Sequence, residues 1–162
     1  MLIRPALPAD EATVAAILEP ICATGAVFCA PPDGGCDGAL AYWGWGRPDT
    51  RVFLAEDDGQ ALGTYYLRPN QTGNGRHVAN AGYATAPAAQ GRGVARSMLA
   101  HSLDTAKAAG FRAMQYNFVV STNVRAIATW QAAGFEIVGR LPGAFDHPSH
   151  GATDALVMFR AL

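Results

Sequence analysis

The sequence predicts an α/β (α+β) domain with a mixed, mostly antiparallel sheet of about seven strands and about four helices. Three observations predict it. Two alternating runs joined by an Asp-Gly turn, from Arg51 to Leu67, indicate a β-hairpin. Apolar residues from Val94 to Ala106 recur at a spacing close to 3.6, which is typical of an amphipathic helix. The region from Phe111 to Arg160 is expected to form a strand, a helix and two further strands.

The first fifty residues contain one more strand and two more helices. A short strand over Leu2 to Arg4 precedes a helix that Asp10 is expected to cap and that ends near Gly25. A segment rich in Pro, Gly and Asp follows, and then a second short helix. An aromatic cluster is expected to pack that helix against the core: Tyr42, Trp43 and Trp45.

The remaining elements lie between His77 and the end of the chain. A strand over His77 to Thr85 is the third consecutive antiparallel member of the sheet, and Gly82 within it is expected to mark a β-bulge. Gly110 ends the long helix, and Gly134 ends a helix over Asn123 to Ala133. The last two strands are expected at Phe135 to Arg140 and Ala155 to Arg160.

Composition limits the kind of protein. Half of the 162 residues are apolar, so one domain over residues 1–162 can form a core without metal or disulfide support. Twelve basic and thirteen acidic residues leave a formal charge of -1, which argues against a general nucleic-acid or membrane surface. No secretory signal or long apolar run is recognisable, so a cytoplasmic protein is expected. Cys22, Cys29 and Cys36 fit neither a disulfide framework nor a metal site and are expected to be reduced.

The segment from Ala86 to Ala95, A-P-A-A-Q-G-R-G-V-A, opens the long helix without a side-chain cap. Its backbone N–H groups are expected to point outward, where the helix dipole adds about half a positive charge. Arg92 and Arg96 reinforce this end, so the sequence predicts a site for an anion such as a diphosphate. The segment has neither the Gly-Lys-Ser/Thr of a P-loop nor the third glycine of a dinucleotide fingerprint. A tight connection without a ligand is the alternative that the glycine turn alone leaves open.

Two motifs in this sequence resemble one known family. Q-G-R-G-V-A resembles the Gln/Arg-x-x-Gly-x-Gly/Ala acetyl-CoA motif of the GNAT N-acyltransferases, in its usual place after a strand and Pro87. S-T-N-V-R-A-I-A-T-W-Q-A-A-G-F-E-I-V-G resembles the second signature of that superfamily, and the resemblance extends over nearly the whole chain. H-V-A-N-A-G-Y and V-S-T-N are further similar to the GNAT branch that acetylates proline analogues such as azetidine-2-carboxylate.

The resemblance implies that the fourth and fifth strands splay apart and that the pantetheine arm of acetyl-CoA lies between them. The diphosphate is then expected at the N–H groups of Gly91 to Ala95, and the arm at the backbone near Tyr83 to Thr85. No metal is expected. The residues expected to bind acetyl-CoA are Ala84, Thr85, Gln90, Gly91, Arg92, Gly93, Val94, Ala95, Arg96, Asn123 and Trp130.

The sequence departs from the family pattern at the usual acid and base. The family commonly has a Tyr acid where this chain has Trp130, and an indole donates a hydrogen bond but is no useful acid. The carboxylate that the fourth strand often carries is replaced by Ala81 and Gly82. The resemblance therefore implies direct attack of the amine on the thioester, with proximity supplying much of the rate.

Asparagines mark the fourth and fifth strands instead. The substrate-contacting asparagines of the proline-analogue branch fall on Asn80 and Asn117, whose amides can hold a carboxylate or the thioester carbonyl. The alternative is that both are satisfied strand amides. Asn123 can cap its helix as well as touch the cofactor.

Two other candidates are weighed against simpler roles. Tyr83 can deliver a proton to the leaving sulfur, but a lone strand tyrosine is more often a packing residue. A cluster near the last hairpin lacks the spacing of zinc enzymes and is expected to form a rim of the acceptor pocket: Asp146, His147, His150 and Asp154. Asn80, Asn117 and Tyr83 are therefore the candidate catalytic residues.

The predicted function is that of an acetyl-CoA-dependent N-acetyltransferase, which moves an acetyl group to the nitrogen of a small amine or amino-acid-like acceptor in a ternary complex. One alternative is a catalytically silent acetyl-CoA-binding module, which the missing Tyr and carboxylate motivate. Another is a protein-directed N-acetyltransferase. The expected partner is a small molecule, with no nucleic acid or membrane, and the family resemblance allows a homodimer.

Overall fold

The computed structural model describes residues 1–162 and contains seven strands and four α-helices. The strands are β1 (Leu2–Pro5), β2 (Arg51–Asp57), β3 (Gln60–Pro69), β4 (Val78–Thr85), β5 (Ala113–Val120), β6 (Glu136–His147) and β7 (Gly151–Ala161). The helices are α1 (Glu11–Cys22), α2 (Gly35–Trp43), α3 (Val94–Ala108) and α4 (Val124–Ala132). The predicted fold class is confirmed.

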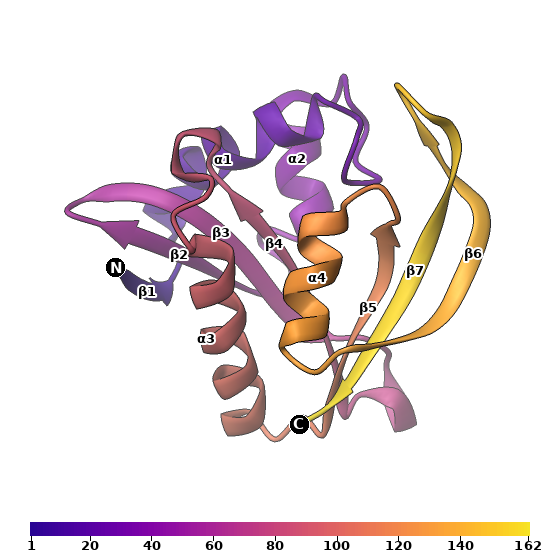
Figure 1. Ribbon diagram of the computed structural model, residues 1–162. Coiled ribbons are helices and arrows are strands. Elements are labelled where there is room, and N and C mark those ends of the chain that lie inside the picture. The colour runs from indigo at the N-terminus through magenta and orange to yellow at the C-terminus, as the bar shows by residue number, and fades with distance from the viewer.

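One sheet runs through the whole molecule in the order β1-β2-β3-β4-β5-β7-β6 (Figure 1). All neighbours are antiparallel except β4 and β5, which are parallel because α3 connects them. The Asp-Gly turn between β2 and β3 is present, with Asp58 and Gly59 both at positive φ (48° and 76°), as a two-residue hairpin turn requires.

The parallel pair β4 and β5 is joined only at its beginning. Its register contains two pairs, Val78 with Ala113 and Ala79 with Met114, after which the strands diverge. On its other side β4 pairs with β3 as far as Thr85. From Asn80 onward β4 therefore has a neighbour on one side and an open gap on the other, as the splay expected from the family resemblance requires.

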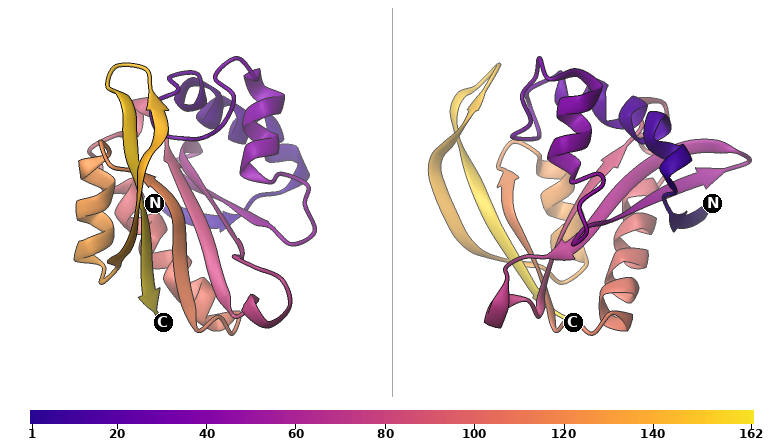
Figure 2. Two further views of the ribbon diagram at one scale, coloured as in Figure 1. Left: turned by 90° about the vertical axis from the view of Figure 1, so that its right-hand side faces the viewer. Right: turned by 180° about the vertical axis from the view of Figure 1, so that it is seen from behind.

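Helices cover both faces of the sheet, and each face has its own hydrophobic core. On one face α3 and α4 pack around Met98, Tyr116 and Trp130. On the other face α1 and α2 pack around Leu18 and Trp43. The views in Figure 2 show the two helical layers separated by the sheet. The gap between β4 and β5 is thus the place where the sheet does not separate the two faces completely. None of the four helices has both the length and the apolar character needed to cross a lipid bilayer.

Several helix ends lie where the sequence predicts them. Gly110 and Gly134 have left-handed φ values of 83° and 86°, which end α3 and α4 where glycine is favoured. The final hairpin is longer than expected, because β6 and β7 continue past Arg140 to a turn between His147 and Gly151. The apolar pattern fades there because β6 is an edge strand that is mostly exposed on both sides.

The prediction that the Asp10 side chain caps α1 is wrong, because this side chain binds other groups. Asp10 occupies the N-cap position, but its side chain makes no capping hydrogen bond to α1. It accepts instead from the Leu7 N–H at 2.7 Å and from both terminal nitrogens of Arg4 at 2.7 and 3.0 Å. Arg4 also binds Glu56, so this ion pair ties the start of α1 to β1 and β2. The hydrogen bond from Arg4 lowers the pKa of Asp10 to about 2.

The Asp10→Asn variant is therefore expected to lose stability at neutral pH but not in strong acid. A depressed folded-state pKa contributes stability that is present above the unfolded pKa and is lost as the pH falls through the folded pKa. Urea unfolding of both proteins should show a difference at pH 7 that shrinks below about pH 4 and is lost only below about pH 2. The exposed Asp33→Asn is the control, and a difference that stayed constant with pH would contradict this account.

The prediction of a β-bulge at Gly82 is also wrong. The ladder between β3 and β4 is continuous through the pair Tyr66 and Gly82, and the irregularity lies in β2 between Ala55 and Glu56. Glycine is needed at position 82 for space, since a Cβ atom there would stand 2.6 Å from Cε1 of Tyr66. The ring of Tyr66 lies against the bare backbone of β4.

The Gly82→Ala variant is expected to destabilise the fold by about 1–3 kcal/mol, because the Tyr66 ring must leave a packed position. Thermal or denaturant unfolding measures this change. Gly139→Ala in β6 is the matched control: its Cβ would meet Val157 at an ordinary 3.6 Å, so its stability should stay close to that of the parent protein. Equal effects of the two substitutions would refute the steric explanation.

Candidate active site

The turn between β4 and α3 presents unpaired backbone N–H groups. A short 3-10 turn over Pro87–Ala89 follows β4, Gly91 and Gly93 have φ values of 78° and 80°, and α3 begins at Val94 with no side-chain cap. The N–H groups of Gly91, Gly93 and the first three helical residues have no partner within the chain. Because these donors stand at the positive end of a 15-residue helix, the turn is suited to hold a diphosphate.

The two arginines near this turn are differently placed. Arg92 is half exposed and lies 3.9 Å from Asp57, at the limit of an ion pair. Arg96 has no acidic partner and lines a pocket of ≈ 270 Å³ between α3 and α4. Arg96 is therefore the basic side chain that is free to reach a ligand along this face.

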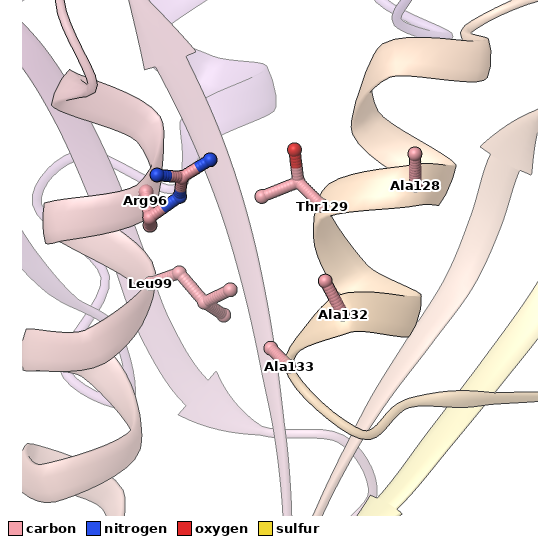
Figure 3. A pocket seen from close by; sticks show the side chains of 6 residues that line it. All are labelled: Arg96, Leu99, Ala128, Thr129, Ala132 and Ala133. Carbon is pink, nitrogen blue, oxygen red and sulfur yellow. The ribbon is translucent and has the colours of Figure 1, made fainter.

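The pocket between α3 and α4 is a groove lined by small side chains. In Figure 3, Arg96 and Leu99 from α3 face Thr129 and Ala132 from α4 and Ala133 directly after it. The small side chains on the α4 side leave the space between the two helices unfilled. Arg96 belongs to the first turn of α3, so the groove begins close to the unpaired N–H groups of the turn.

The alternation of β4 determines which backbone groups face the gap. The Ala86 N–H donates to a carbonyl of β3, whereas the His77 carbonyl accepts from the residue just before β5. Because backbone direction alternates along a strand, the odd-numbered residues of β4 face β5. The N–H and C=O groups of Ala81, Tyr83 and Thr85 therefore lie along the gap, beyond the last β4–β5 pair, and can form hydrogen bonds with an amide-bearing ligand arm.

The other residues predicted to touch the cofactor lie near this gap or support it. Ala84 pairs with Thr64 of β3, so its own N–H and C=O face away from the gap. The Asn123 side chain accepts from the Ala126 N–H at 3.4 Å and thus caps α4. Gln90 is an exposed turn residue, and Trp130 is buried within the α4 face of the gap.

Tyr83 belongs to a directed chain of hydroxyl groups. The Ser102 hydroxyl donates to the Leu99 carbonyl at 2.8 Å and so accepts from the Tyr83 hydroxyl at 2.7 Å. The oxygen of Tyr83 in turn accepts from the Tyr116 hydroxyl at 3.0 Å. Trp130 packs against both tyrosine rings, with centroid distances of 5.0 and 5.3 Å. These hydrogen-bonded hydroxyl groups therefore link β5, β4 and α3 across the gap.

Burial keeps both of these tyrosines protonated. It raises the pKa of Tyr83 to about 12 and that of Tyr116 well above its ordinary value. The proton of Tyr83 is directed at Ser102 in α3. Along the alternating strand, Tyr83 also projects to the face of the sheet opposite to that of Asn80. The structure therefore does not bring Tyr83 together with the two asparagines.

Asn80 and Asn117 line one polar pocket beside the beginning of the gap. Asn80 is 5% exposed; its Oδ1 accepts from the Tyr66 hydroxyl at 3.1 Å and its Nδ2 donates to the Gln115 carbonyl at 2.9 Å. Asn117 is exposed; its Oδ1 accepts from the Gln115 side chain at 2.8 Å and its Nδ2 donates to Asn70 at 2.7 Å. Asn80 thus bridges β4 and β5 where their backbone pairing ends.

This pocket has a volume of ≈ 280 Å³ and no hydrophobic lining residue. Its lining includes three residues that sequence reasoning missed: Arg47, Arg68 and Asn70. The signal for Arg68 was present but weak, because the residue follows the last apolar position of β3 and resembles an ordinary strand end. Only the β3–β4 register, in which Arg68 is opposite Asn80, places it in the pocket.

The His and Asp cluster of the last hairpin lies elsewhere. The rings of His147 and His150 are 4.6 Å apart at the tip, and Asp154 binds Arg140 and the Gly143 N–H. None of these side chains lines the polar pocket of Asn80 and Asn117. No group of three or more His, Cys, Asp or Glu side chains is arranged to hold a metal ion, and the three cysteines are free thiols.

The chain is similar to known acetyltransferases over most or all of its length. Residues 25–135 match the acetyltransferase (GNAT) family. The chain is 30% identical over 111 residues to N-acetyltransferase aca1 of Schizosaccharomyces pombe, a match that covers 68% of this chain and 53% of that protein. The chain therefore spans about half the length of this curated relative.

Solved structures show the same fold. A GCN5-related N-acetyltransferase from Kribbella flavida is 38% identical, with a TM-score of 0.92 over 99% of this chain and 97% of that one. The structure of yncA, a putative acetyltransferase from Salmonella typhimurium with its cofactor acetyl-CoA, is 23% identical, with a TM-score of 0.85 over 100% and 94% of the two chains. The splayed strands, the uncapped helix and the groove fit that cofactor. The chain belongs to the acetyltransferase (GNAT) family, whose acyl donor is acetyl-CoA.

Proposed function

We propose that this protein transfers the acetyl group of acetyl-CoA to the nitrogen of a small amine or amino-acid-like acceptor, by direct attack in a ternary complex. The observation that carries the proposal is the polar pocket of Asn80 and Asn117 at the base of the β4–β5 gap. Bound acetyl-CoA supplies an activated thioester from the α3–α4 face. The pocket supplies the acceptor from the other side of the sheet.

The protein contributes position more than acid–base chemistry. Asn80 and Asn117 each retain an unused N–H that can hold an acceptor, and the backbone N–H groups of Tyr83 and Thr85 can stabilise an oxyanion. The one acidic residue of the pocket, Asp49, is bound by Arg47 and is not free as a base. Holding two reactants in an attack geometry is worth about 7–11 kcal/mol of the barrier, so the reaction does not require a strong acid or base.

A coupled assay of thiol release tests the proposal. With acetyl-CoA and a panel of amino acids, proline analogues and polyamines, we expect turnover of at least one acceptor. Asn80→Ala should lower kcat/KM about tenfold to a hundredfold, because it leaves the Tyr66 hydroxyl and the Gln115 carbonyl without their partner. Asn74→Ala is the control, since that side chain makes no hydrogen bond and lies outside the pocket.

Two results would count against the proposal. Binding of acetyl-CoA without turnover of any acceptor would favour a catalytically silent binding module. Turnover that is confined to lysine-containing peptides or protein N-termini would show that the acceptor is a protein. Calorimetry with acetyl-CoA distinguishes the first result from a simple failure to bind the cofactor.

The hydroxyl chain across the gap predicts a separate effect on the cofactor. We expect Tyr116→Phe and Tyr83→Phe to weaken acetyl-CoA binding about twofold to tenfold, because the loss of the hydrogen bond lets β4 and β5 shift relative to α3. The kcat at saturating acetyl-CoA should remain close to the parent value. A fall in kcat alone would instead support the predicted proton delivery by Tyr83.

Tyr65→Phe is the matched control for this measurement. Tyr65 is also a buried strand tyrosine that binds α3, through His101 at 2.7 Å, but it lies on β3 away from the gap. It should lose a comparable amount of thermal stability without a change in the dissociation constant of acetyl-CoA. Equal changes in the dissociation constant for Tyr65→Phe and Tyr116→Phe would show that the hydrogen-bonded hydroxyl groups have no specific role in cofactor binding.

A further inference from the structure

We propose that Arg68 forms an anion subsite in the acceptor pocket, so that the acceptor carries a carboxylate close to its reactive nitrogen. This inference rests on the proposed function, because it concerns the molecule that receives the acetyl group. It assigns a role to a residue that neither the sequence motifs nor the family resemblance marked. Three independent features of the pocket support it.

The first feature is the charge of the pocket. It contains two arginines and one acidic residue. Arg47 and Asp49 neutralise each other through two hydrogen bonds of 3.1 Å. Arg68 has no carboxylate within 4.0 Å, so its charge is uncompensated. A cationic acceptor without an anionic group, such as a polyamine, would meet repulsion here, whereas a carboxylate would be attracted.

The second feature is the way in which Arg68 is held. Its guanidinium carbon lies 4.6 Å from the centroid of the Tyr66 ring, and the Tyr66 hydroxyl donates to Asn80. Stacking fixes the plane of the guanidinium but leaves its N–H edge free to pair with a carboxylate. Because Arg68 and Asn80 are opposite each other in the β3–β4 register, the two groups form one rigid surface. Arg68 is therefore preorganised, which lowers the entropy lost on binding.

The third feature is a surplus of hydrogen-bond donors. The Oδ1 atoms of Asn80, Asn117 and Asn70 all accept hydrogen bonds within the chain. Asn80 and Asn117 each keep one unused N–H, and neither N–H of the Asn70 side chain has a partner. A group that offers only acceptors complements such a surface. An ionised carboxylate is that group.

The position of Asn80 then orients the acceptor. Asn80 donates to the Gln115 carbonyl where β4 and β5 separate, so it marks the edge of the pocket next to the gap. A carboxylate held at Arg68 leaves the neighbouring nitrogen of a small amino acid directed at the gap. Direct attack on the thioester requires this arrangement, and a pocket of ≈ 280 Å³ limits the acceptor to a small molecule.

The test compares an acceptor with the same molecule lacking its carboxylate, for example proline with pyrrolidine and azetidine-2-carboxylate with azetidine. The parent protein should prefer the carboxylate-bearing acceptor. Arg68→Met should lower kcat/KM for that acceptor about tenfold to a hundredfold, mainly through KM, as expected for the loss of a charged hydrogen bond. The rate with the analogue that lacks the carboxylate, which is a cation at neutral pH, should stay the same or rise, because the variant removes the repulsion from Arg68. Arg68→Lys should restore part of the loss, because it keeps the charge but not the bidentate geometry.

Arg51→Met is the matched control, because Arg51 also stands over an aromatic ring, that of Phe53, at 5.9 Å, but outside the pocket. It should leave the preference between the two acceptors intact. No preference in the parent protein, or an equal loss for both acceptors in Arg68→Met, would overturn the inference.

Failure of the proposed function has a different signature. If no acceptor turns over, calorimetric titration of the amino acid and of its analogue without the carboxylate into the acetyl-CoA complex decides the question by binding alone. Weaker binding of the amino acid to Arg68→Met, with no weakening for the analogue, would support the anion subsite. Equal binding of the amino acid to the parent protein and to Arg68→Met would refute it.

Discussion

The loss of backbone pairing between β4 and β5 after Ala79 is the constraint on which the site depends. An unpaired strand edge inside a protein is costly, because each buried N–H and C=O needs a partner. Here the exposed groups of Ala81, Tyr83 and Thr85 are available to a ligand that brings its own amides. A pantetheine arm would meet that requirement, and by the proposed mode of binding it would complete the sheet.

Hydrogen bonds of side chains span the gap in two places. On the α3–α4 face, the hydroxyl groups of Tyr116, Tyr83 and Ser102 span the strands and tie them to the cofactor helix. At the base of the gap, Asn80 reaches the Gln115 carbonyl and replaces a backbone pair with a side-chain bridge. The two linkages lie on different faces, so one lies on the α3–α4 side of the sheet while the other borders the polar pocket of Asn80 and Asn117.

The sequence was most informative where local chemistry and long-range structure agree. The period of α3, the Asp-Gly hairpin turn and the glycine after each of the last two helices placed their elements well, because each is determined within a few residues. The uncapped start of α3 was also visible, since the absence of a capping side chain is a local fact. Strand ends were less visible where β6 is exposed and its apolar pattern fades.

What the sequence could not supply depends on contacts between separate elements of the fold. Asp10 bonds Arg4 rather than the helix it precedes, because β1 brings a guanidinium beside it. Gly82 makes room for a ring from the neighbouring strand instead of forming a bulge. Arg68 enters the pocket only through its register with Asn80, so no motif along the chain marks it. Each of these facts is a contact between separate elements that a one-dimensional pattern does not contain.

The ring of Tyr66 connects the core around α2 with the polar pocket. It touches Trp43 edge-on at 5.0 Å on the α2 side, lies over the backbone at Gly82, stacks under Arg68 and bonds Asn80. The packing of α1 and α2 therefore sets the position of two polar groups that it never contacts directly. Under the proposed function, acceptor preference can therefore change through repacking of α2 around Trp43, while every residue that lines the polar pocket stays the same.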